Sequence, residues 1–175
     1  MQSGLDEAIM LTSEGHVSEG SAENIFLLIN NELVTPPPSE NILLGVTRET
    51  VMELARRELD RITRERVVDR TELYVADEIF LTGTGAQIAP VIEVDHRPIG
   101  TGAIGPVSEE IQRIYHEVVR GMRPEYLHWC TPAFSARSAT PKPVVRAAEH
   151  AHSGANGNGY KPAARSRARV PSKAQ

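Results

Sequence analysis

The chain has 175 residues, of which 40% are apolar and 24% are charged, a composition typical of a globular protein. Its single cysteine, Cys130, excludes an internal disulfide framework, and no run approaches the roughly 18 apolar residues of a transmembrane helix. The N-terminus lacks the basic and apolar regions of a signal peptide, so we expect a soluble, cytoplasmic protein without a membrane partner.

Charge divides the chain into two regions. Residues 1–134 hold 11 arginines, no lysine and 22 acidic residues, a net charge of −11, whereas residues 135–175 carry +7. The acidic region predicts no nucleic-acid partner, because its field repels phosphate. Residues 135–175 contain no Leu or Ile, so we expect a disordered basic tail, with salt-dependent nucleic-acid binding by this tail as an alternative role.

Three apolar segments in the first part of the chain predict β-strands. They are Glu7–Thr12, Asn24–Ile29 and Leu33–Thr35. The second is apolar enough to be buried on both faces of a sheet. A turn at Ser13–His16 precedes it, and Asn30 and Asn31 suit a tight hairpin after it. The prolines from Pro36 onward end the pairing.

A helix is predicted next, with Thr47 as its N-cap and Glu49 in its first turn. Its apolar positions at helical spacing are Val51, Leu54, Ala55 and Leu59. Several arginines of this region are predicted to form a solvated helix face, paired with Glu53, Glu58 and Asp60. These arginines are Arg56, Arg57, Arg61, Arg64 and Arg66.

The rest of the body alternates strand and helix patterns. Thr71–Ala76 is predicted to form one or two helical turns, and Glu78–Thr82 and Ile88–Val94 are predicted strands on either side of a small-residue loop. Pro106 and Ser108 open a last helix, which ends near Gly121. Its apolar stripe is Ile111, Ile114, Tyr115 and Val118. These elements predict an α/β (α+β) fold with a mixed sheet and two flanking helices.

Three segments carry groups that could bind a ligand. Leu44–Arg48 opens a helix, where free N–H groups attract an anion, although an ordinary capped helix gives the same pattern. Thr82–Ala86 has two glycines and two hydroxyl groups, which suit either an oxyanion nest or a tight turn. Glu19–Phe26 places two carboxylates beside a core strand, where they could face a cationic nitrogen or belong to a charged turn.

Other candidates for chemistry are weaker. Cys130 beside Trp129 is interpreted as a packed thiol rather than a nucleophile. The histidines of the body show no metal-ligand spacing, so no metal site is predicted. These histidines are His16, His96, His116 and His128.

Taken together and in this order, several motifs resemble the C-terminal half of branched-chain amino-acid aminotransferases, which are pyridoxal-phosphate (PLP) enzymes of fold type IV. The motifs are EAIML, EGSAENIF, TPP, ILLGVTRETV, ELYVADEIFLTGTGAQIAPV, GPV and VVRG. The resemblance runs from about Leu5 to Phe134. It implies that residues 1–134 form the PLP-cradling C-terminal domain, a mixed sheet or pseudo-barrel with flanking helices.

The resemblance also implies site residues. Glu19 matches the carboxylate that binds the pyridine nitrogen of PLP, and a negative partner keeps that nitrogen protonated so that the ring accepts electrons. Val46 and Thr47 match the helix start that holds the cofactor phosphate, and Thr84 matches a further phosphate ligand.

The same comparison implies a substrate site. The backbone N–H groups of Thr84 and Gly85 match the pair that receives the substrate carboxylate, and Glu23 and Asn24 match positions that support the site. The implied reaction is transamination between Leu, Ile or Val and 2-oxoglutarate. The GPV and VVRG motifs favour this group over two relatives with the same fold, D-amino-acid transaminases and aminodeoxychorismate lyases.

No catalytic residue is expected in this chain. The family's Schiff-base lysine lies upstream of EGSAEN, yet none of the 18 residues before Glu19 is a lysine, and Lys142, Lys161 and Lys173 all lie in the predicted tail. We therefore expect a truncated transaminase that is inactive alone and needs a missing N-terminal domain or an oligomeric partner. One half of a split enzyme and a non-catalytic binding module are the alternatives.

Overall fold

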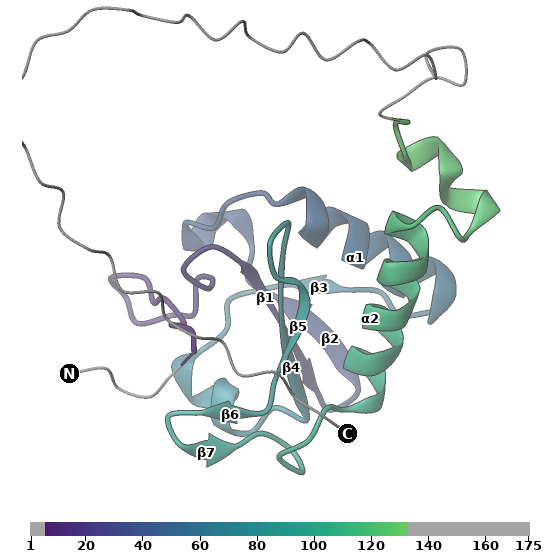
Figure 1. Cartoon of the computed structure of the whole chain (residues 1–175). Helices are drawn as coiled ribbons and strands as arrows, with labels where there is room; N and C mark the ends of the chain where they lie inside the picture. The colour runs from purple at the N-terminus through teal and green to yellow at the C-terminus, as the bar shows by residue number, and fades with distance from the viewer. Residues whose placement is uncertain (1–5, 133–175) are drawn as a thin grey trace, which may run out of the picture. The chain divides into compact units, whose positions relative to one another are not determined.

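The structure, a computed structural model, describes residues 6–132, and the predicted tail at residues 135–175 lies outside this range. Five strands form one sheet in the order β3-β2-β1-β4-β5 (Figure 1). Their bounds are β1 Asn24–Ile29, β2 Glu32–Thr35, β3 Arg64–Glu65, β4 Glu78–Gly83 and β5 Gln87–Val91. The β2–β3 pair is parallel and the other pairs are antiparallel, so the sheet is mixed, as the sequence predicted.

Two helices and several short elements complete the described part of the chain. The helices are α1 Val46–Glu58 and α2 Pro106–Val119. A second, two-stranded sheet consists of β6 Glu93–Val94 and β7 Arg97–Pro98. The 3-10 helices are Pro38–Glu40, Arg70–Tyr74 and Pro124–Trp129. Over residues 6–132, neither helix combines the length and the apolar character needed to span a bilayer.

The β1–β2 hairpin follows directly from its turn residues. Asn30 and Asn31 have φ values of 50° and 66°, the left-handed conformation that a two-residue hairpin turn requires. Ile29 pairs with Glu32 across this turn, and the Asp77 Oδ2 accepts the Asn30 N–H at 3.0 Å. The predicted hairpin is therefore confirmed.

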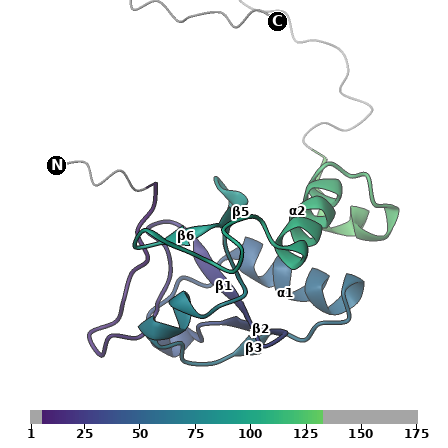
Figure 2. The same ribbon diagram turned by 90° about the horizontal axis from the view of Figure 1, so that it is seen from below.

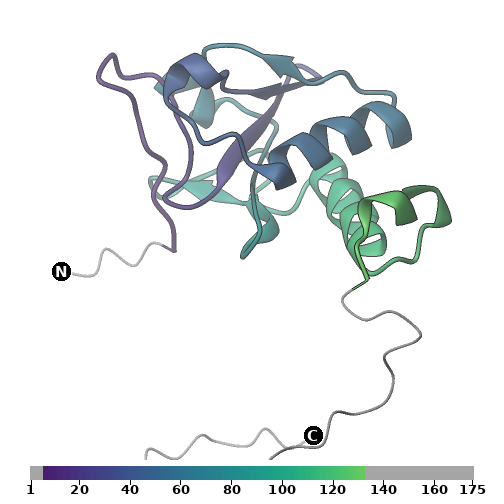
Figure 3. The ribbon, with the colours of Figure 1, turned by 90° about the horizontal axis from the view of Figure 1, so that it is seen from above.

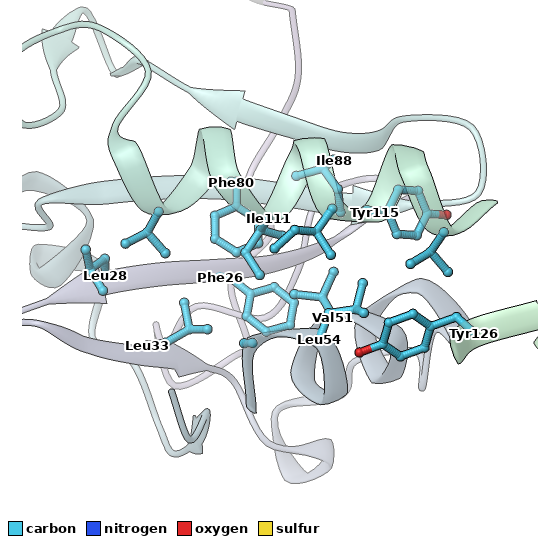
Figure 4. Packing of buried hydrophobic residues seen from close by; sticks show 14 residues of the cluster. Phe26, Leu28, Leu33, Val51, Leu54, Phe80, Ile88, Ile111, Tyr115 and Tyr126 are labelled. Atoms are coloured by element: carbon cyan, nitrogen blue, oxygen red, sulfur yellow. The ribbon is translucent and has the colours of Figure 1, made fainter. Parts of the chain in front are cut away.

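Alternating side chains of β1 and β4 divide the core into two clusters. On one face, Phe26 and Phe80 stack with ring centroids 5.1 Å apart, and α1 and α2 pack over them (Figure 4). The two helices lie next to each other on this side of the sheet, as the views from below and from above both show (Figures 2 and 3). On the other face, the cluster includes Ile25, Leu27, Ile79, Val17 and Leu73, the last from the 3-10 helix Arg70–Tyr74. β1 is consequently buried on both faces, as predicted.

Two predicted strands are wrong in part. The segment Glu7–Thr12 forms only one isolated bridge, between Leu11 and Val17, because the turn containing Gly15 (φ 89°) reverses the chain directly after it. The run Ile88–Val94 is not one strand. The chain exchanges partners at Ile92, whose carbonyl accepts the Ile99 N–H, so that β5 pairs with β4 and β6 pairs with β7.

The predicted arginine face is also wrong beyond α1. Arg56 and Arg57 lie on the helix and both bond Glu53, as expected. The helix ends at Glu58, and Asp60 takes a left-handed φ of 50°. The later arginines therefore leave the helix and find separate partners, which are Asn31 for Arg61, Glu32 for Arg64 and Glu72 for Arg66.

Candidate functional site

The starts of β1 and α1 and the end of β4 meet at one end of the main sheet. Asn24 begins β1 and lies directly opposite Thr82 in the register of β1 with β4. Gly45 precedes α1 and lies against Asn24 so closely that a Cβ at this position would overlap the amide oxygen of Asn24. A side chain there would displace the Asn24 amide, which is hydrogen-bonded to Glu19 and Leu43, and this accounts for the glycine at the start of the helix.

Glu19 is fixed at this corner by hydrogen bonds to one of its carboxylate oxygens. The backbone N–H of Leu43 and the side-chain amide of Asn24 each donate to the Glu19 Oε2, at 2.9 Å in both cases. The same Asn24 amide donates to the Leu43 carbonyl at 2.7 Å. Because both bonds use the Oε2, the Oε1 of this half-exposed carboxylate stays available to a ligand.

The N-terminus of α1 is open. Gly45 is the N-cap residue, with φ −75° and ψ 135°, and no side chain caps the helix. The first intrahelical bond runs from the Glu49 N–H to the Gly45 carbonyl at 3.1 Å, so the N–H groups of Val46, Thr47 and Arg48 precede the ladder and lack intrahelical acceptors. Free N–H groups at the positive end of a helix dipole are donors that suit an anion.

Thr47 was predicted to be the N-cap, and this is wrong. The structure places Thr47 at the second helical position, because α1 begins one residue earlier at Val46. Its side chain is buried, whereas the Val46 side chain is 78% exposed. Sequence reasoning favoured the hydroxyl residue over the glycine, but the close contact with Asn24 decides which residue can occupy the cap.

A buried hydroxyl at the same corner has no partner. The Oγ1 of Thr82 forms no hydrogen bond within the structure, and Thr82 is only 1% exposed. Its pairing opposite Asn24 puts both side chains on the same face of the sheet, the face that α1 covers. Buried hydroxyl groups normally find a partner, so this one marks a place where the chain leaves a polar group unmatched.

The loop after β4 is exposed to solvent at Thr84 and Gly85. A Cβ at Gly85 would meet no atom within 4 Å. Gly83 is different, because its Cβ position lies 3.2 Å from the Ala22 carbonyl and 3.3 Å from the Glu23 side chain. The loop thus leaves the sheet beside the turn that follows Glu19.

Glu23 shapes that turn from within. Its carbonyl accepts the Gly20 N–H at 2.6 Å, and its carboxylate accepts the Ala22 N–H at 3.1 Å. The turn at 20–23 therefore closes on itself and holds Glu19 next to the start of β1. The supporting role of Glu23, which the resemblance implies, stays a prediction.

The structure brings the predicted residues to one end of the sheet in two groups. Glu19, Asn24 and the start of α1 at Val46 and Thr47 are linked through Leu43 and Gly45. Glu23 joins them to the loop of Thr84 and Gly85 through its contact with Gly83. Sequence reasoning missed one contributor, the peptide of Leu43, which no residue type or spacing indicates. It included Thr82 in the segment Thr82–Ala86, but it did not predict that this hydroxyl is buried without a partner.

This corner combines the uncapped start of α1, which carries a partial positive charge, with the anchored Glu19 carboxylate and the exposed loop of Thr84 and Gly85. Such a set fits a ligand with a phosphate at one end and a protonated nitrogen at the other. A separate cleft of about 940 Å³ lies between residues 6–11 and 89–95, and its described lining contains none of the predicted site residues. No cluster of three or more His, Cys, Asp or Glu side chains within residues 6–132 is placed to hold a metal ion.

Comparison with known proteins gives consistent matches. A family model described as amino-transferase class IV matches residues 1–94. A probable branched-chain-amino-acid aminotransferase of Aquifex aeolicus is 49% identical over 134 residues, which is 77% of this chain and 43% of that protein. The branched-chain-amino-acid aminotransferase of Pseudomonas aeruginosa is 43% identical over 73% of this chain and 41% of its own length.

Solved structures agree with these relatives. The branched-chain amino acid aminotransferase of Thermobaculum terrenum in its PLP form superposes with a TM-score of 0.72 at 44% identity, covering 74% of this chain and 42% of that one. The branched-chain amino acid aminotransferase of Escherichia coli gives a TM-score of 0.63 at 42% identity, covering 65% and 38%. The present chain thus spans about two fifths of the length of the proteins it matches.

Proposed function

Because the chain belongs to the class IV aminotransferase family, we propose that it forms the cofactor-cradling part of a PLP-dependent branched-chain amino-acid aminotransferase. The observation that carries this proposal is the uncapped N-terminus of α1 beside the anchored carboxylate of Glu19. A phosphate and a pyridine nitrogen are the two polar ends of PLP, and these two features offer one partner to each.

Each residue of the cradle has a defined task in this proposal. The N–H groups of Val46 and Thr47 bind the phosphate, with the Thr84 hydroxyl as a further donor. The Oε1 of Glu19 faces the pyridine nitrogen and holds a proton on it, while Leu43 and Asn24 fix the Oε2 of the same carboxylate. When bound, PLP supplies the electron sink that makes the α-carbon of an amino acid acidic.

The substrate carboxylate binds next to the cofactor. The exposed backbone N–H groups of Thr84 and Gly85 are the donors, since a loop without side-chain crowding lets a carboxylate approach the peptide closely. The relatives named above are branched-chain amino-acid aminotransferases, and we assign amino-acid and 2-oxo-acid substrates of this class to the present chain. Glu23 and Asn24 support this site by shaping the turn and the carboxylate contacts.

The reactive amine comes from elsewhere. The sequence contains no lysine before Lys142, and the described residues therefore provide no amine to form the Schiff base or to transfer the α-proton. We propose that a second stretch of polypeptide supplies this lysine and covers the cradle. Exposed apolar side chains at the edge of the site, Leu43 (73%), Leu44 (58%) and Val46 (78%), fit such a cover.

Complementation tests this proposal. The 175-residue chain alone should not transaminate Leu, Ile or Val with 2-oxoglutarate, and co-expression with the lysine-bearing N-terminal part of a relative should restore turnover. In the complex, Glu19→Ala should lower kcat by about 10²-fold or more, because the pyridine nitrogen loses the partner that keeps it protonated. Glu14→Ala is the matched control, since Glu14 is an exposed carboxylate on the preceding turn.

Two results would contradict the proposal. One is normal turnover by the isolated chain after replacement of Lys142, Lys161 and Lys173. The other is a chain that stays monomeric, binds no hydrophobic dye and forms no complex with the lysine-bearing part of a relative. The second result favours a non-catalytic binding module, the class that the absence of a lysine from residues 1–141 supports.

A further inference from the structure

The segment that leads into α1 begins at a buried carboxylate. Glu40, the last residue of the 3-10 helix Pro38–Glu40, is only 8% exposed, and carboxylates are rarely buried without a partner. Its Oε2 lies 3.1 Å from the Nδ1 of His16, and its carbonyl accepts the Ser18 hydroxyl at 2.7 Å. Both side chain and backbone of Glu40 are therefore tied to the stretch that ends at Glu19.

The other end of this segment reaches the candidate site. Three residues after Glu40, the Leu43 N–H donates to the Glu19 carboxylate at 2.9 Å, and the Leu43 carbonyl accepts from the Asn24 amide at 2.7 Å. Asn41 takes a left-handed φ of 59°, which turns the chain between these two attachment points. Residues 40–45 are consequently held at both ends by the short stretch 16–24.

We propose that Glu40 is a positioning residue, which His16 and Ser18 lock in place so that the Leu43 peptide presets the Glu19 carboxylate and the start of α1. The inference rests on the proposed function, because the groups it positions are the two that would hold the cofactor. Glu40 touches neither end of the cofactor in this scheme. It acts through the backbone of residues 40–45.

The backbone of His16 is itself anchored. Its backbone N–H donates to the Thr12 hydroxyl at 3.3 Å, and its backbone bridges to Asp69. The imidazole is about one-third exposed, whereas the Glu40 side chain is only 10% exposed. The backbone of His16 is thus held on two sides, and its ring covers a carboxylate that has little contact with solvent.

The test compares Glu40→Ala, Glu40→Gln and Ser18→Ala with a control, Glu117→Ala, in the full chain. Glu117 lies on α2 and is also partly buried, and its carboxylate accepts hydrogen bonds from Arg113 and Arg123, which belong neither to residues 40–45 nor to the stretch 16–24. The first readout is hydrogen exchange of the Leu43 amide, which requires no ligand. The second is the affinity for inorganic phosphate, read from the amide resonances of Val46 and Thr47.

We expect Glu40→Ala to speed exchange at Leu43 by about tenfold or more and to weaken phosphate binding by a similar factor. Glu40→Gln retains an oxygen that accepts from the imidazole and should restore most of both properties. Ser18→Ala loses one bond and should give a smaller change of the same sign. Glu117→Ala should lower stability while leaving both readouts unchanged.

The inference is overturned if Leu43 exchange in Ser18→Ala and Glu40→Ala matches the wild-type chain, or if Glu117→Ala changes it equally. Should Glu40→Ala fail to fold, Ser18→Ala decides the matter, because it removes only a hydroxyl. A wild-type chain that binds neither phosphate nor PLP defeats the proposed function separately, since the Leu43 amide reports on the lock without any ligand.

Discussion

The two helices begin in similar ways but differ in how their first N–H groups are satisfied. Each has a glycine as its N-cap, Gly45 for α1 and Gly105 for α2, and neither cap residue contributes a side-chain hydrogen bond. At α2 the buried carboxylate of Glu78 reaches across from β4 and accepts the N–H groups of Val107 and Ser108, at 3.1 and 2.7 Å. The described residues place no such carboxylate at the start of α1.

This difference separates a helix start that the fold itself satisfies from one that we propose binds a ligand. Gly105 lies so close to Glu78 that a Cβ there would overlap the carboxylate, just as a Cβ at Gly45 would overlap Asn24. Both glycines thus admit a polar side chain to the helix end. At α2 that side chain is an anion which satisfies the N–H groups, whereas at α1 it is a neutral amide which holds Glu19 and leaves the N–H groups free.

Removing the internal anion of α2 should have the largest effect. One oxygen of Glu78 accepts two hydrogen bonds from Ser108, and the residue is only 6% exposed. In Glu78→Gln an amide group takes the place of one carboxylate oxygen, so the side chain can no longer accept every hydrogen bond that the start of α2 donates to it. We expect a loss of about 3 kcal/mol in the free energy of unfolding, measured with urea.

The matched control for this change is Glu109→Gln on the same helix. Glu109 is an exposed carboxylate in the first turn of α2, so its loss should cost only about 0.5 kcal/mol through the helix dipole. Equal losses in the two variants would show that the Glu78 contacts add nothing beyond a general charge effect.

An added anion should bind at the uncapped start of α1 and not at the start of α2, where Glu78 already accepts the N–H groups. Inorganic phosphate should shift the amide resonances of Val46 and Thr47, while those of Val107 and Ser108 stay unchanged. At about 100 times the dissociation constant, binding should raise the free energy of unfolding by about 2.7 kcal/mol. Chloride at equal ionic strength is the control, and shifts of equal size at both helices would contradict the comparison.

The sequence predicted the elements around these helix starts better than the starts themselves. The asparagine pair of the hairpin, the apolar run of β1 and the helical spacing in α2 depend on local conformation and periodicity, and the structure has all three. The N-cap of α1 depends on a contact between Gly45 and Asn24, which are far apart in the sequence. Local preference favoured Thr47, and tertiary packing overrode it.

The site shows the same limit. Resemblance named Glu19, Val46, Thr47 and the loop of Thr84, and the structure places these segments at one end of the sheet. The contacts that orient them involve the peptide of Leu43 and the pair of His16 with Glu40. A contact made by a backbone group does not depend on residue type, so the sequence does not predict it. His16 and Glu40 are 24 positions apart, and no helix or strand periodicity predicts that they pair.

The far end of α1 is closed by side chains and gives the third test. Its last residue, Glu58, accepts the Tyr126 hydroxyl and the Arg123 guanidinium, the latter at 2.6 Å. Tyr126→Phe removes a hydrogen bond to a charged group, so we expect a loss of about 2 kcal/mol at pH 7 in urea unfolding. Tyr74→Phe, which removes an exposed hydroxyl bonded to Asp95, should cost less than half of that.

The same phenol predicts how stability depends on alkaline pH. Burial, and then the hydrogen bond to the Glu58 carboxylate, raise the pKa of Tyr126 from 10 to about 12. The folded state therefore favours the neutral phenol, so its contribution is fully present below pH 10 and is lost as pH rises from 10 toward 12. The wild-type chain should lose more stability than Tyr126→Phe over this interval, and parallel losses would contradict the assignment.

The C-terminal end of α2 should give the smallest effect. Gly121 has φ 66°, its N–H donates to the Val118 carbonyl at 2.9 Å, and the next N–H, that of Met122, donates to Glu117 at 2.9 Å. This pair of bonds is a Schellman motif, which uses glycine because a side chain strains the left-handed conformation. Gly121→Ala should therefore lower the free energy of unfolding by about 1 kcal/mol in urea titration. Gly85→Ala is the control, since Gly85 has no positive φ and its Cβ would meet open space, so it should leave stability nearly unchanged. If both substitutions lower the free energy of unfolding equally, the left-handed conformation of Gly121 does not stabilise the end of α2, and the Schellman motif does not explain this glycine.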